Sequence, residues 1–182
     1  MKCPGLSWGG RSESIRDCIR LGMDTVKLQQ KISCRNYEAI ENILSKGIPV
    51  IFATARPPRM VKLLLPSSLY DRSFKIFYNG ALIIDHRNVM MAHHTMDVSA
   101  YHELMDYMEN LEYFPCVSIE ATDQLFCNHE VNNSFGVPVN PHIVPLEKMR
   151  KLLPTKILLS KVKDEDIEEI MNTFGHKFNI FV

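Results

Sequence analysis

The stretch Ile48-Pro49-Val50-Ile51-Phe52-Ala53-Thr54-Ala55-Arg56-Pro57 decides the fold. Its apolar run, Ile48 to Ala53, is typical of a short strand buried on both faces of a parallel sheet. Thr54 follows at the carboxyl end, where open α/β sheets bind ligands. There the Thr54 hydroxyl, nearby backbone N–H groups and the Arg56 guanidinium can bind a phosphate group. Taken alone, however, Thr54 is explained by the preference of threonine for strands.

Segments on both sides of this strand alternate between helix and strand signals. Ser33 can cap a helix that runs to about Lys46. A second helix can open at the proline pair 57–58, since proline is tolerated in a first turn, and Phe74 to Tyr78 is typical of another strand. Such alternation predicts βαβ units and a parallel sheet, so the expected fold class is α/β. The buried stripe of the first helix is expected to consist of Ala39, Ile40, Ile43 and Leu44.

The chain is predicted to have three parts. Residues 1–30 form an irregular segment with room for one or two helical turns at Ser14–Leu21, residues 31–85 a partial core with parallel strands, and residues 86–182 an α+β module. The boundary between the last two parts is placed at 85–87. In the last part we expect a helix that Asp164 caps and a final strand from Phe178 to Val182. The acidic start of that helix is interpreted as a solvated turn that complements the helix dipole, not as a metal site.

Composition narrows the class of partner and the compartment. The chain carries 21 Lys and Arg against 21 Asp and Glu, so its zero formal charge gives no electrostatic reason to expect nucleic acid or an anionic membrane. Five scattered cysteines without a C-x-x-C pair argue against a disulfide framework and favour a reducing compartment. No apolar run approaches the roughly 20 residues that span a bilayer, and the N-terminus lacks the apolar region of a signal peptide. We therefore expect a cytoplasmic protein.

A second motif, Phe77-Tyr78-Asn79-Gly80-Ala81, follows further along the chain. On its own, Asn-Gly indicates a hairpin turn. In order, however, Lys31-Ile32-Ser33, the strand that ends in Thr54-Ala55-Arg56-Pro57-Pro58, and this second motif resemble the Cof-type branch of the haloacid dehalogenase (HAD) superfamily. The resemblance runs from residue 32 to residue 84, and the rest of the chain is more loosely similar to that family's α/β cap. It implies a partial Rossmann-like HAD core with an α+β cap domain.

The resemblance implies a Mg²⁺-dependent phosphatase of small phosphorylated metabolites, such as sugar phosphates. In that family one Asp attacks phosphorus, a second Asp acts as general acid and base, and a Thr or Ser holds the phosphate. Thr54 matches this hydroxyl, and Ala55 and Arg56 match the residues that follow it. Asn79-Gly80-Ala81 matches the family's turn near the active site.

The resemblance stops at both ends of the matching stretch. The family opens with an apolar strand and Asp-x-Asp-Gly-Thr, whereas this chain has Leu21-Gly22-Met23-Asp24-Thr25. Asp24 can stand for the second Asp only with a one-residue gap, and no carboxylate stands at the nucleophile's position. The preceding segment, Arg11 to Arg20, is too charged for the family's buried strand. The family's Lys and its Mg²⁺-binding acidic loop come after the cap, whereas by this resemblance Val182 still lies within the cap. We therefore predict a truncated chain without appreciable turnover, for which Mg²⁺ binding is not expected.

Two alternatives stay open. The chain can be a non-catalytic protein that binds a ligand or another protein, because an interrupted sheet leaves open edges that favour pairing with another chain, including a second copy. It can also be a gene fragment without a function of its own.

Overall fold

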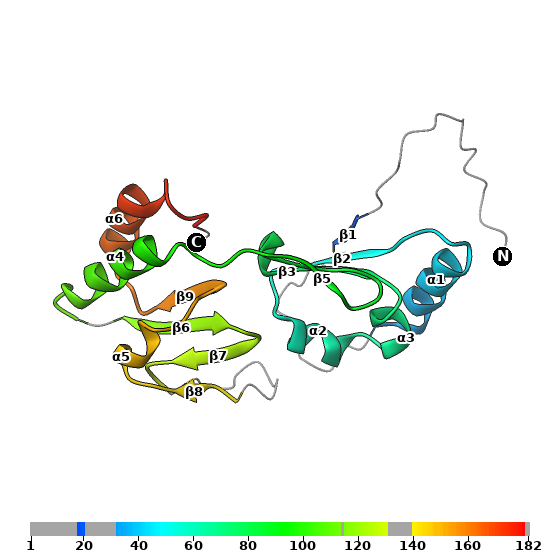
Figure 1. Ribbon diagram of the computed structural model, residues 1–182, viewed down its shortest axis with the longest axis horizontal. Coiled ribbons are helices and arrows are strands. Elements are labelled where there is room, and N and C mark those ends of the chain that lie inside the picture. Colours follow the sequence, from blue (N-terminus) through cyan, green and yellow to red (C-terminus); the bar gives the residue numbers. More distant parts are fainter. Residues whose placement is uncertain (1–17, 21–31, 114, 131–139, 181–182) are drawn as a thin grey trace.

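The structure, a computed structural model, describes residues 18–20, 32–113, 115–130 and 140–180. Figure 1 shows two lobes side by side, each with its own sheet and helices. We call the described residues up to 93 the first lobe and residues 97–180 the second lobe. Asp24, which the sequence offered as a catalytic candidate, lies outside the described residues.

The first lobe contains a five-stranded sheet in the order β1-β2-β3-β4-β5. Strands β1 and β3 both pair with β2 in parallel, while β3, β4 and β5 form an antiparallel meander. The mixed sheet confirms the α/β class and its parallel strands. Its strands are β1 (Cys18–Arg20), β2 (Ile51–Ala53), β3 (Phe74–Phe77), β4 (Leu82–Ile84) and β5 (Met90–His93).

Strand β1 corrects the prediction for the start of the chain. Cys18–Arg20 was expected within a helical turn, and the charged segment that contains it was judged unable to form the family's first strand. The structure instead pairs Ile19 with Phe52 in a parallel ladder. A strand of three residues needs few apolar neighbours, and pairing with β2 outweighs the weak local preference for helix.

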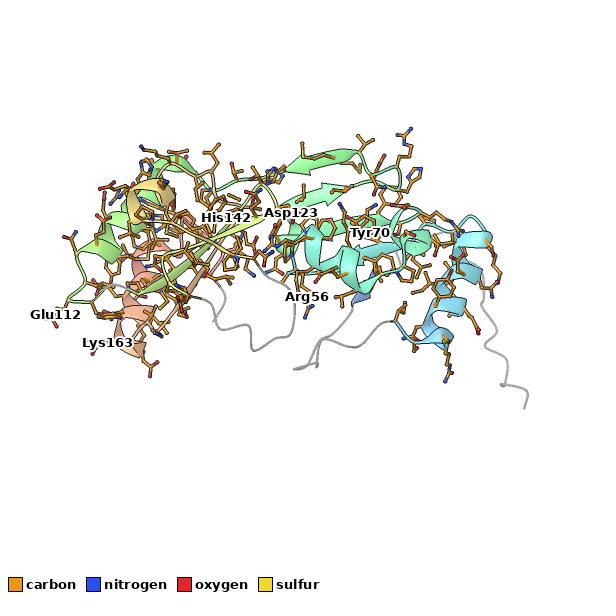
Figure 2. The ribbon with its side chains drawn as sticks, turned by 90° about the horizontal axis from the view of Figure 1, so that it is seen from below. Arg56, Tyr70, Glu112, Asp123, His142 and Lys163 are labelled. Atoms are coloured by element: carbon orange, nitrogen blue, oxygen red, sulfur yellow. The ribbon has the colours of Figure 1, made fainter. Side chains whose placement is uncertain are left out.

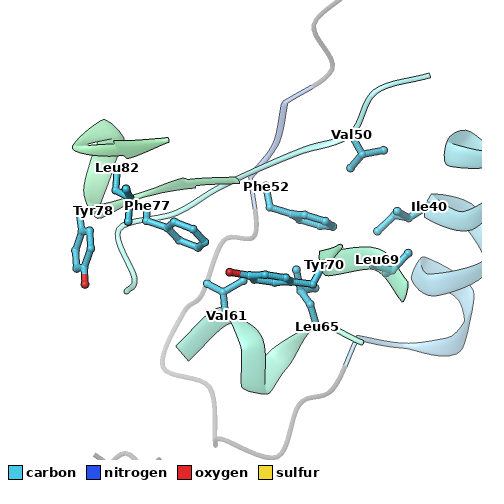
Figure 3. Close-up of a cluster of buried hydrophobic side chains, with 10 residues drawn as sticks. All are labelled: Ile40, Val50, Phe52, Val61, Leu65, Leu69, Tyr70, Phe77, Tyr78 and Leu82. Carbon is cyan, nitrogen blue, oxygen red and sulfur yellow. The ribbon is translucent and has the colours of Figure 1, made fainter. Parts of the chain in front are cut away.

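Three helices cover the first sheet: α1 (Cys34–Ser45), α2 (Pro58–Leu64) and α3 (Ser67–Tyr70). The Ser33 hydroxyl accepts a hydrogen bond from the backbone N–H of Asn36 at 3.3 Å, which confirms the predicted cap. Ala39, by contrast, is exposed, because the inward stripe of α1 runs from Tyr37 through Ile40 to Leu44 at helical spacing. Figure 3 shows the buried core between sheet and helices, which consists of Ile40, Val50, Phe52, Val61, Leu65, Leu69, Tyr70, Phe77, Tyr78 and Leu82.

The second lobe contains a four-stranded sheet in the order β8-β7-β6-β9. Its strands are β6 (Cys116–Ala121), β7 (Gln124–Cys127), β8 (His142–Ile143) and β9 (Lys156–Ser160), and its helices are α4 (Val98–Glu109), α5 (Leu146–Met149) and α6 (Asp164–Phe174). Helices α4 and α6 lie on the same face of this sheet (Figure 1). Buried side chains of α4 and β6, including Tyr101, Met105 and Ile119, form a second core. None of the described helices is long and apolar enough to cross a membrane.

Three details of the later chain differ from the sequence prediction. The residue before α6 is Lys163, and Asp164 is the first helical residue and not the cap. Phe178 to Ile180 do not form the expected final strand, and residues 181–182 lie outside the described residues. Strand β5 lies beyond the boundary expected at 85–87, yet it pairs with β4. The first sheet therefore continues to His93, because an antiparallel partner can follow directly after a tight turn.

Candidate functional site

The structure brings the two predicted motifs together at one edge of the first sheet. Thr54 follows β2 and Asn79 follows β3, so both lie at the carboxyl ends of neighbouring parallel strands. The backbone N–H of Asn79 donates to the carbonyl of Thr54 at 3.2 Å, and that of Tyr78 donates to the carbonyl of Arg56 at 3.4 Å. These hydrogen bonds join the loop Thr54–Arg56 to the turn Tyr78–Gly80.

The loop Thr54–Arg56, called the Thr54 loop below, is folded around the Thr54 hydroxyl. This oxygen accepts a hydrogen bond from the backbone N–H of Arg56 at 3.2 Å, an arrangement typical of a hydroxyl-stabilised turn. Because the hydroxyl accepts here, its own proton is available to a further acceptor. Thr54 is half-buried, whereas Ala55 is exposed.

Arg56 carries a polar group without a partner. Its Nη1 is buried, and no described residue accepts a hydrogen bond from it. Burial lowers the pKa of Arg56 below its ordinary value, although an arginine remains protonated at neutral pH. Figure 2 shows Arg56 on the first lobe near the start of α2. A half-buried guanidinium with an unsatisfied donor is a favourable place for an anion, because an oxyanion can accept two parallel hydrogen bonds from it.

The turn after β3 has an unusual backbone. Tyr78, Asn79 and Gly80 have φ values of 52°, 57° and 110°. These values lie in the region of positive φ that residues other than glycine seldom adopt. This turn reverses the chain from β3 into the antiparallel β4. The hairpin expected from Asn-Gly is therefore confirmed, and the same hairpin places Asn79 beside Thr54.

The stretch that follows β1 holds the remaining predicted residue, Asp24, which lies outside the described residues. Arg20, the last residue of β1, pairs with Ala53, so the chain leaves β1 at the same edge of the sheet as Thr54. Magnesium ions in proteins are bound by oxygen ligands, usually one or two carboxylates together with waters and substrate phosphate oxygens. The described residues contain no group of three or more His, Cys, Asp or Glu side chains that could hold a metal. Of the described residues at this edge, Thr54, Arg56 and Asn79 carry no carboxylate, so by themselves they do not fit a Mg²⁺ site.

Sequence reasoning missed an ion cluster next to this site. Arg59, in the first turn of α2, donates to both carboxylate oxygens of Glu120 at 2.6 and 2.7 Å, and it lies 3.4 Å from Asp123. Burial on its own lowers the pKa of Arg59, but the hydrogen bond and charge of Glu120 outweigh burial and raise it. Arg59 and Glu120 are 61 residues apart, and no local pattern in the sequence indicates such a pair.

Tyr78 lies close to the same cluster. Its hydroxyl is buried and has no hydrogen-bond partner among the described residues. Burial, together with the carboxylates of Glu120 and Asp123, raises the pKa of Tyr78 well above its usual range. The hydroxyl is therefore neutral and can only donate or accept a hydrogen bond.

A cavity of about 740 Å³ lies between the two lobes. The first lobe lines it with the turn at Asn79 and Gly80, and the second lobe mainly with apolar side chains such as Ile157 and Phe178. Thr54 and Arg56 are not among its lining residues. The cavity therefore reaches the candidate site only at the Asn79 turn.

Comparison with known families gives a match over most of the chain. The sequence profile of the haloacid dehalogenase-like hydrolases matches residues 25–182. That span includes the Thr54 loop, the Asn79 turn and the second lobe. Among curated proteins, none matches this chain.

Several solved structures share the fold at low sequence identity. BT1666 from Bacteroides thetaiotaomicron, described among the phosphatases of the HAD superfamily, is 16% identical with a TM-score of 0.66 over 91% of this chain and 63% of its own. TM0651 from Thermotoga maritima is 18% identical with a TM-score of 0.67 over 89% and 61%. The HAD subclass IIB sugar phosphatase BT4131 is 16% identical with a TM-score of 0.66 over 87% and 62%. The chain thus spans less than two thirds of the length of these structures.

Proposed function

Because the chain belongs to the haloacid dehalogenase-like hydrolases, we propose that its Thr54 loop binds the phosphate group of a small phosphorylated metabolite. The observation that carries this proposal is the buried Nη1 of Arg56, which has no hydrogen-bond partner among the described residues. The backbone N–H of the same residue donates to the Thr54 hydroxyl. An unsatisfied buried donor is costly, so a site that keeps one is suited to a ligand that satisfies it.

Each group of the site has a separate task in this proposal. The Thr54 hydroxyl donates its free proton to one phosphate oxygen, and the Arg56 guanidinium donates to others. The Asn79 turn does not need to touch the phosphate, since its hydrogen bonds to the carbonyls of Thr54 and Arg56 hold the loop in shape. Such a preformed site binds with less ordering of side chains than a flexible one.

For catalysis, we propose that this chain hydrolyses phosphate esters poorly. The family's chemistry uses two Asp residues, one as nucleophile and one as acid and base. Between β1 and α1, residues 21–33 contain one carboxylate, that of Asp24. Losing one member of a catalytic group commonly costs several orders of magnitude in rate. The family's Mg²⁺ would supply charge neutralisation, but Thr54, Arg56 and Asn79 carry no carboxylate that could hold it.

The ligand we propose is a phosphorylated organic molecule, such as a sugar phosphate. One support is the cavity of about 740 Å³ that adjoins the Asn79 turn, which has room for the organic part of such a ligand. A second support is that one structural neighbour is a sugar phosphatase. The non-catalytic alternative, in which the chain binds such a ligand without converting it, uses the same groups.

Calorimetric titration with inorganic phosphate tests the binding proposal. We expect saturable binding that weakens about tenfold or more in Arg56→Met, because a charge-assisted hydrogen bond contributes about 1.5–3 kcal/mol. Arg72→Met is the matched control, since it removes the same charge from an exposed pair with Glu41. Equal weakening in both variants would show only general charge attraction and would refute the site.

An assay of phosphate release from an aryl phosphate, with and without Mg²⁺, tests the proposed lack of turnover. We expect the purified chain to release phosphate no faster than Thr54→Ala does. Release that depends on Mg²⁺ and disappears in Thr54→Ala would contradict the proposal and show that the chain is a working phosphatase.

We also propose that the protein is cytoplasmic and that it associates with a second copy of itself. Scattered cysteines support a cytoplasmic protein, which cell fractionation can check. The edge strands of both sheets are β1, β5, β8 and β9, and no further described strand pairs with their outer sides. Such edges support association of the chain with a second copy. Light scattering tests this association, and a single monomeric species at high concentration would argue against it.

A further inference from the structure

The two lobes meet at the ion cluster of Arg59, Glu120 and Asp123. Figure 2 shows Asp123 at the junction between the lobes. It lies in the tight turn between β6 and β7, where Thr122 and Asp123 have φ values of 50° and 60°. Its carboxylate accepts a hydrogen bond from the backbone N–H of Arg59 at 3.2 Å. The turn of the second lobe therefore contacts the first turn of α2 through both side chain and backbone.

Burial distinguishes this cluster from the other polar contacts between the lobes. The side chain of Glu120 is only 6% exposed and that of Arg59 28%, so water screens their attraction less than that of a surface pair. The contact between His93 Nε2 and Thr155 Oγ1, at 2.8 Å, is exposed. A buried carboxylate that lost its cation would carry a large desolvation cost, so Glu120 strongly favours the arrangement in which Arg59 reaches it.

The cluster lies directly next to the Thr54 loop in the chain. Helix α2 begins at Pro58, two residues after Arg56, and Arg59 is the following residue. The first turn of α2 is thus held from one side by the β6–β7 turn of the second lobe. The contacts of that turn therefore act on the residues that connect to Arg56.

We propose that Arg59 is a positioning residue that locks the β6–β7 turn onto the start of α2. In this arrangement the second lobe, through Glu120 and Asp123, fixes the segment that carries Arg56. The lock does not depend on whether phosphate binds, and so it goes beyond the proposed function. The second lobe thus has a role in shaping the phosphate site, although none of its described residues is among the proposed phosphate ligands.

Amide hydrogen exchange at Arg59 reports directly on this contact, because the backbone N–H of Arg59 donates to the carboxylate of Asp123. In the full chain, Glu120→Gln should speed exchange at Arg59 and at the β6–β7 turn about tenfold or more, as expected for loss of a charge-assisted contact. The matched control is Glu41→Gln, which removes a carboxylate from the exposed pair with Arg72 and should leave exchange at Arg59 unchanged. Should Glu120→Gln fold poorly, Asp123→Asn offers a milder change at a more exposed position.

Three further variants separate positioning from general stability. Arg59→Lys keeps a cation and should restore part of the protection that Arg59→Met loses. Thr54→Ala should weaken phosphate binding but leave exchange at Arg59 unchanged, so the lock and the phosphate site can fail independently. Unchanged exchange at Arg59 in Glu120→Gln, or an equal acceleration in α1, would overturn the proposal.

Discussion

Lys75 offers a sharp test of how the first lobe accommodates a buried charge. The residue is fully buried in β3, where its Nζ donates to the carbonyl of Tyr70 at 3.0 Å and to Asn88 Oδ1 at 2.7 Å. It also lies 4.6 Å from the centre of the Tyr70 ring. These contacts satisfy the ammonium group, although burial still lowers the pKa of Lys75.

Two replacements of Lys75 should differ in their effect on the free energy of unfolding. Lys75→Met keeps most of the side-chain volume and loses two hydrogen bonds of a charged group, about 1.5–3 kcal/mol each. It also avoids the desolvation of an ammonium, which costs several kcal/mol, so the net change should stay within about 2 kcal/mol. Lys75→Ala leaves a cavity as well and should cost about 2–5 kcal/mol.

The pH dependence of the free energy of unfolding gives an independent test of the buried charge of Lys75. The folded pKa of Lys75 lies below its unfolded value of about 10.4, so between the two the unfolded state binds more protons. The stability of the wild type should therefore rise with pH on approaching that value, relative to Lys75→Met. Denaturant unfolding followed by circular dichroism, at neutral and alkaline pH, measures both effects. Equal costs for Met and Ala, together with parallel pH profiles, would refute this account of Lys75.

Three further substitutions test local features of the first lobe. Ser33→Ala should lower the free energy of unfolding by about 0.5–2 kcal/mol, because the cap of α1 is lost; an unchanged denaturant midpoint would contradict this. Gly80→Ala should cost about 1–2 kcal/mol from backbone strain alone, since φ is 110° and, apart from its chain neighbours, no described residue has an atom within 4 Å of the added Cβ; full retention of stability would show that the turn can relax. The hydrogen bond from the backbone N–H of Val89, and to a smaller extent that from Arg87, lowers the pKa of Asp85. The Asp85 carboxylate therefore stabilises the fold above its unfolded pKa of about 3.9, and this stabilisation is lost as pH falls through the folded pKa. Acid titration of Asp85→Asn should accordingly show a weaker loss of stability below about pH 5 than the wild type, and identical curves would exclude this role.

Much of the candidate site could be predicted because its signals are local. An apolar run that ends in Thr54 indicates a strand end, and the Asn79-Gly80 pair indicates the turn after the next strand. Parallel pairing of β2 with β3 then places both ends at one edge. The helix that begins after Ser33 was likewise encoded by a cap and a repeating apolar pattern.

Features that depend on distant partners could not be predicted. Nothing in the run Phe74-Lys75-Ile76-Phe77 indicates that its lysine is buried, yet Lys75 is buried and donates to acceptors of Tyr70 and Asn88. Arg59 pairs with Glu120, which lies 61 residues away in the chain and on the other lobe. In each case a charged side chain is satisfied by groups that no periodic pattern links to it.

The most direct test of the central claim is a crystal structure of this chain soaked with phosphate or tungstate. We predict an anion within hydrogen-bond distance of the Thr54 hydroxyl and of Arg56 Nη1, the buried donor without a partner among the described residues. An empty Thr54 loop at saturating anion, or an anion bound elsewhere while Arg56 is satisfied by another protein group, would contradict the proposed phosphate site.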